Sequence, residues 1–110
     1  MSYRVDLTAD EIAFIKASVA GVVKRTQERA HEQEAINLTV AAAGAVTRLN
    51  EARINHRDVM FLCVCIKKTQ EHLRGCVELS TSQNDVAQTL CHQLIRKLEG
   101  SGRDFTVLQP

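Results

Sequence analysis

Residues 58–76, "DVMFLCVCIKKTQEHLRGC", decide how this chain folds, because they are compatible with two different structures. Eight apolar residues run without a break from Val59 to Ile66. The β-branched residues and cysteines within that run are typical of a strand. A hairpin over 59–79 would need a turn inside "KKTQEH", which contains no Gly, Asn or Pro. We therefore favour a helix and keep an α+β fold with that hairpin as the alternative.

The residues that flank the apolar run carry the signals of helix ends. Asn55 followed by Asp58 is an N-cap pattern, and it places an acidic group in the first helical turn. At the other end, the basic Arg74 comes directly before Gly75, which is typical of a helix C-terminus. These signals predict a helix over 56–74.

Three further segments have the apolar periodicity of amphipathic helices, and they span residues 8–30, 33–53 and 83–99. Thr8 and Glu11 form a capping-box pattern at the start of the first segment. The junction between the first two segments is polar and has neither Gly nor Pro, so residues 8–53 could be one bent helix or two. Together the segments predict an all-α fold, a four-helix antiparallel bundle-like domain.

The length and charge of the chain restrict its class. We expect one helical domain over 1–110, with a short flexible N-terminus (1–7) and a flexible C-terminal tail (101–110). The net charge of +1 gives no strong field for nucleic acid or a membrane surface. No apolar run approaches the roughly 20 residues of a membrane span, and the first residues do not resemble a signal peptide. We therefore expect a cytoplasmic protein with reduced cysteines and no membrane contact.

The cysteines and histidines do not form a recognisable chemical motif. On a helix, Cys63 and Cys65 would point about 200° apart and could not bind one metal ion together. His72 and Cys76 are four residues apart, but Gly75 lies between them. The chain has no Gly-rich phosphate loop and no Gly-x-Ser-x-Gly motif. We predict no catalytic residue, no metal site and no cofactor, and a Cys/His metal-binding or thiol-reactive protein is the third reading.

The segment 33–53 has small or apolar residues on two stripes, which is more than one neighbouring helix requires. Within it, "AAAGA" (41–45) has so little side-chain volume that a second helix could approach closely. We therefore expect a small non-enzymatic interaction or regulatory protein (an adaptor, inhibitor or chaperone-like protein) that forms a homodimer and binds another protein. The candidate interface residues are Ile36, Val40, Ala42, Ala45, Val46 and Leu49.

A basic face is the basis of the alternative function, a nucleic-acid-binding regulator. Its candidate residues are Arg48, Arg53, Arg57, Lys67, Lys68 and Arg74, to which Arg25 and Arg29 could add. Acidic residues such as Asp58 and Glu71 are interspersed, and the chain has only four aromatic residues that could stack on bases. This alternative is therefore not favoured.

Overall fold

The computed structural model describes residues 2–29 and 31–108, and it describes the side chains of residues 4–29 and 31–100. The elements follow in the order β1 (Ser2–Arg4), α1 (Ala9–Gln27), α2 (Glu32–Asn50), β2 (Arg53–Asn55), α3 (His56–Arg74) and α4 (Thr81–Leu108). The fold is all-α and bundle-like, as the sequence predicts. The alternative hairpin over 59–79 is wrong, because α3 is helical without a break to Arg74.

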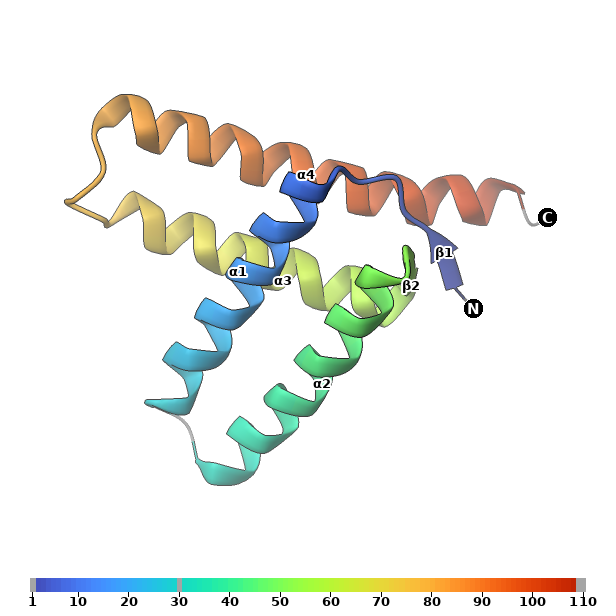
Figure 1. Ribbon diagram of the computed structural model, residues 1–110, viewed down its shortest axis with the longest axis horizontal. Helices are drawn as coiled ribbons and strands as arrows, with labels where there is room; N and C mark the ends of the chain where they lie inside the picture. Colours follow the sequence, from blue (N-terminus) through green and yellow to red (C-terminus); the bar gives the residue numbers. More distant parts are fainter. Residues whose placement is uncertain (1, 30, 109–110) are drawn as a thin grey trace.

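The helices are arranged as two antiparallel hairpins that cross. Figure 1 shows α1 and α2 side by side in one hairpin and α3 and α4 in the other, with α1 passing against α3. The shortest dimension of the molecule, 21 Å, corresponds to about two helix layers. The strands β1 and β2 pair antiparallel, with Tyr3 opposite Ile54, near the passage from α2 into α3. The bundle therefore consists of two crossed pairs instead of four aligned helices.

Regular secondary structure extends into both end segments of the chain within the described residues. At the N-terminus β1 forms a strand, and the Val5 N–H donates to the Ala52 carbonyl at 3.2 Å. At the C-terminus α4 continues through Gly100 to Leu108, since a glycine lowers helix propensity by only about 1 kcal/mol and does not forbid a helix. Residues 1, 109 and 110 of the expected flexible ends lie outside the described part.

The first two segments form separate helices. α1 ends at Gln27 and α2 begins at Glu32, so the polar stretch between them is a reversal of the chain. The Thr8 and Glu11 capping box at the start of α1 is present, with the Glu11 N–H donating to Thr8 Oγ1 at 3.2 Å. The polarity of the connection suits a turn at the exposed end of a hairpin, where no neighbour would cover apolar side chains.

The apolar run in α3 is explained by its central position between two other helices. α3 packs against α4 and against α1. Burial raises the pKa of Cys63, and the nearby charge of Glu99 on α4 raises it further. Burial also raises the pKa of Cys65, while the charges of Lys68 and of Arg25 on α1 lower it. Because opposite sides of α3 are covered, residues that point about 200° apart are both buried. Burial on two sides explains most of the apolar run, whereas Met60 and Val64 within it are 58% and 49% exposed.

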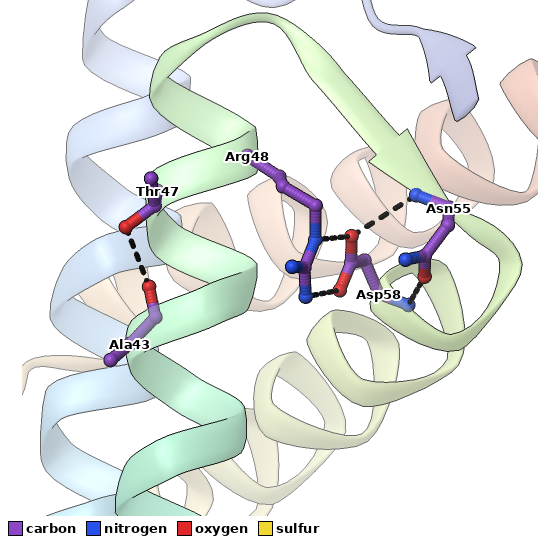
Figure 2. Close-up of polar contacts among 5 residues, drawn as sticks. All are labelled: Ala43, Thr47, Arg48, Asn55 and Asp58. Atoms are coloured by element: carbon purple, nitrogen blue, oxygen red, sulfur yellow. Dashed lines mark hydrogen bonds and ion pairs between the residues drawn. The ribbon is translucent and has the colours of Figure 1, made fainter. Parts of the chain in front are cut away.

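A buried carboxylate joins α2 to the start of α3 (Figure 2). The Asp58 side chain is 3% exposed and accepts hydrogen bonds from Arg48 Nε at 2.5 Å and Arg48 Nη2 at 2.7 Å. It also accepts from the Asn55 backbone N–H at 3.0 Å, while the Asp58 N–H donates to Asn55 Oδ1 at 2.8 Å. Asp58 thus completes the capping box of α3 and also forms an ion pair with Arg48 of α2.

We predict that Asp58→Asn will destabilise the protein by about 1–2 kcal/mol, because it weakens the cap of α3 and removes the charge-assisted bonds to Arg48, whose side chain is 41% exposed and stays hydrated. Urea unfolding at pH 7 measures this change. The matched control is Asp85→Asn at an exposed position of α4, for which we expect a loss below about 1 kcal/mol. Equal losses in the two variants would contradict the role of the buried pair.

The same variant should change the acid limb of the stability curve. Burial raises the pKa of Asp58, but the hydrogen bonds from Arg48 and Asn55 outweigh it and hold that pKa below its ordinary value of 3.8. The folded protein therefore binds this proton more weakly than the unfolded chain does. The stabilisation is present above about pH 4 and is lost as the pH falls below it. Wild type should lose more stability between pH 5 and pH 3 than Asp58→Asn.

Candidate functional site

The candidate interface residues lie on two different sides of α2. Ala42, Ala45 and Leu49 are 6%, 1% and 1% exposed and belong to the core of the monomer. Ile36 and Val40 are 49% and 68% exposed. The side chains of Ala45 and Leu49 are therefore covered within the monomer, whereas Ala42 also lines the floor of a cavity between α1 and α2.

The remaining interface candidates border a long apolar groove between α1 and α2, the α1/α2 groove. It consists of two adjoining cavities of about 500 and 330 Å³ that share Gln27 and Thr39. Gln27 Nε2 donates to Thr39 Oγ1 at 3.2 Å between the two helices. The apolar side chains that line the groove include Val19, Val23, Ile36, Val40, Ala43 and Val46.

Charged residues lie along the same groove. Lys16 and Lys24 of α1 line the larger cavity, and Glu32 at the start of α2 lines the smaller one. Lysine stems can cover apolar surface while the ammonium groups stay in water. The groove is therefore apolar along its floor, with positive charge on α1 and negative charge near the hairpin turn.

The residues of the expected basic face are dispersed. Arg48 is bound to Asp58, and Arg74 Nε donates to Gln88 Oε1 at 3.1 Å across the α3–α4 hairpin. Lys67 and Lys68 are neighbours on α3 and so point about 100° apart. Arg53 lies on β2 and Arg57 in the first turn of α3, both exposed. The structure does not bring these six residues to one face.

One of them does belong to a new cluster, the basic pocket. A cavity of about 370 Å³ between α1, α2 and α3 is lined by Val22, Arg25, Thr26, Arg29, Glu34 and Lys68. Three cationic groups thus share a concave site with one carboxylate. Residues 29 and 68 are far apart in the sequence, and only the crossing of α1 over α3 brings them together. The available sequence signal was the Arg25 and Arg29 pair at helical spacing.

The thiols are packed as apolar groups. Cys63, Cys65 and Cys91 are buried, and Cys76 is partly exposed. Burial raises the pKa of both Cys63 and Cys65 to about 11, and it raises the pKa of Cys91. The reactive thiolate is therefore scarce at these three positions at neutral pH. Among the residues that the structure describes, no three Cys, His, Asp or Glu side chains gather in a way that could hold a metal ion.

Comparison of the chain with models of known protein families, with curated proteins and with solved structures finds no match. Within the described part, no helix combines the length and apolarity needed to cross a membrane. The α1/α2 groove and the basic pocket are therefore the features of the structure that bear on function.

We predict that an aromatic disulfide reagent at pH 7.5 will react quickly with one thiol per chain and slowly with three. The fast thiol should be Cys76, because it is the only one of the four that is not buried. Cys76→Ser should remove the fast phase, whereas Cys91→Ser should leave it unchanged. Addition of urea should release the slow thiols together with unfolding. Two or more fast thiols in the folded wild type would contradict this packing.

Proposed function

We propose that the protein is a non-enzymatic helical interaction protein that forms a homodimer through the α1/α2 groove. The supporting observation is that Ile36 and Val40 are exposed directly beside an apolar groove. A single exposed valine would not indicate an interaction site, because much of any protein surface is apolar. A continuous apolar strip with a concave floor is instead typical of an interaction site.

A second copy of the chain suits this groove because the groove is self-complementary. In a twofold dimer the same surface is used by both copies, and the two strips run in opposite directions. The negative end at Glu32 of one copy then approaches the positive stretch at Lys16 of the other. Val40 of each copy enters the groove of its partner, so that both exposed strips are covered at once.

The size of the groove indicates a reversible dimer. From Glu32 to Val46 it extends about 20 Å along α2, and it is two helices wide. A face of this size is at the small end of specific protein interfaces. We expect dissociation in the micromolar range, which allows a second protein to compete for the same surface. Adaptor, inhibitor and chaperone-like functions all require such an exchangeable surface.

We predict that Val40→Glu will shift the protein from dimer to monomer without loss of helix, because a carboxylate would enter the groove of the partner. Sedimentation equilibrium at 100 μM measures the mass against the 12.2 kDa of one chain. The matched control is Val86→Glu on α4, since Val86 is 70% exposed and Val40 is 68% exposed. This control should remain dimeric. A wild-type protein that stays monomeric at this concentration would refute the proposal.

We predict the opposite behaviour for Ala45→Leu, because Ala45 belongs to the core of the monomer and does not line the α1/α2 groove. The larger side chain should overpack the core and lower the free energy of unfolding by about 1–3 kcal/mol. A thermal melt measures this change, and the mass per particle should stay as in wild type. Dissociation without a lower melting temperature would mean that Ala45 contacts a partner chain.

A further inference from the structure

Two helices of this chain carry the same local arrangement of a glycine and an arginine. Residues 20–25 of α1 read "AGVVKR", and residues 43–48 of α2 read "AGAVTR". In both, the arginine side chain folds back by one turn over the glycine. A Cβ on Gly21 would lie 3.1 Å from Arg25 Nη1, and a Cβ on Gly44 would lie 3.0 Å from Arg48 Nη2. Each glycine thus provides the space that its arginine occupies.

The two arginines differ in what their guanidinium groups meet. Arg48 is held by both oxygens of the Asp58 carboxylate. Arg25 Nη2 is buried, yet it has no hydrogen-bond partner among the described residues. A buried donor of a charged group that lacks a partner is costly. Beside Arg25, no carboxylate of the described residues takes the place that Asp58 of α3 takes beside Arg48.

The surroundings of Arg25 also favour an anion. Arg29 and Lys68 line the same cavity, so three positive charges converge from α1, from the turn that follows it and from α3. Glu34 is the one carboxylate in the lining, and it leaves an excess of two positive charges. No hydrogen bond or ion pair joins Glu34 to Arg25 in the part of the chain that the structure describes. A ligand of two or more negative charges would balance the site.

We propose that the basic pocket binds the phosphate groups of a small molecule, such as a diphosphate or a nucleotide. The planar fork of an arginine donates two parallel hydrogen bonds to phosphate oxygens, and a lysine adds a point charge. The cavity of about 370 Å³ is larger than one phosphate group and lies in the size range of small-molecule sites. The dispersed positions of the other basic residues provide no track for a nucleic-acid backbone.

The site is independent of the proposed dimer, because the basic pocket and the α1/α2 groove share no lining residue. Binding of pyrophosphate can therefore be measured whether the protein is a monomer or a dimer. If the protein proves to be a monomer, the dimer proposal fails, but the expected binding of pyrophosphate stays the same.

Isothermal titration calorimetry with inorganic pyrophosphate at low ionic strength tests the proposal. Lys68→Gln should weaken binding about tenfold or more, because it removes one charge from the cavity. Lys67→Gln is the matched control, since it makes the same change one residue away, on an exposed position outside the cavity. It should bind as wild type does. Equal weakening in both variants would show that only bulk charge matters and would overturn the proposal, as would wild type that does not bind.

Gly21→Ala provides a test that leaves every charge in place. The added methyl group would lie 3.1 Å from Arg25 Nη1, so the guanidinium must shift by a few tenths of an ångström and pyrophosphate binding should weaken. The melting temperature should stay the same or rise, because alanine is the better helix former. Binding that is unchanged in this variant would remove Arg25 from the site and contradict the proposal.

A single-stranded DNA 15-mer distinguishes the small-molecule site from a nucleic-acid surface. We expect it to bind no more tightly than pyrophosphate at the same ionic strength. If the DNA binds more tightly, and if Lys67→Gln and Lys68→Gln both weaken it equally, the positive charges act as an extended nucleic-acid face and the small-molecule proposal is wrong.

Discussion

The Asp58 carboxylate is the group on which the arrangement of the two hairpins most depends. It caps α3 through the Asn55 backbone N–H, and it holds Arg48 of α2 through two further hydrogen bonds. Because it is 3% exposed, no water can replace these donors if one is lost. The Lys97 and Glu11 pair joins α4 to α1, with side chains 50% and 13% exposed, and it is screened more strongly by water. The Arg48 and Asp58 pair ties α2 directly to the first turn of α3.

The crossing of the two hairpins has consequences for the surface. In a molecule about two helix layers thick, α1 and α3 each pack against two other helices, whereas α2 packs mainly against α1. The outer side of α2 thus stays open and keeps Ile36 and Val40 exposed. The same crossing brings Lys68 of α3 close to Arg25 of α1 and to Arg29, which follows α1. The groove and the basic pocket both follow from one geometric feature.

The two glycine–arginine pairs show how one local pattern serves two purposes. Gly44 lets the Arg48 side chain lie against α2, where it forms an ion pair with Asp58 of α3. Gly21 lets Arg25 lie against α1, where no carboxylate of the described residues bonds to its buried Nη2. Each glycine costs about 1 kcal/mol of helix propensity relative to alanine. Placement of a guanidinium group gives both glycines a physical reason, one for stability and one for binding.

Local signals in the sequence were enough to predict the helices, because a cap and an apolar period involve residues only a few positions apart. The Asn55 and Asp58 cap correctly outweighed the strand-like composition of 59–66. The sequence could not predict which apolar residues of α2 are buried and which are exposed. Whether Ala42 or Val40 is covered depends on which side of α2 faces α1. Nor could the sequence predict the basic pocket, whose Arg29 and Lys68 meet only because the hairpins cross. Sequence alone thus determined that four segments are helical, but not the pairing of β1 with β2 or the continuation of α4 beyond residue 99. Tertiary packing decided which faces of the helices remain free to bind, because exposure depends on contacts between residues far apart in the chain.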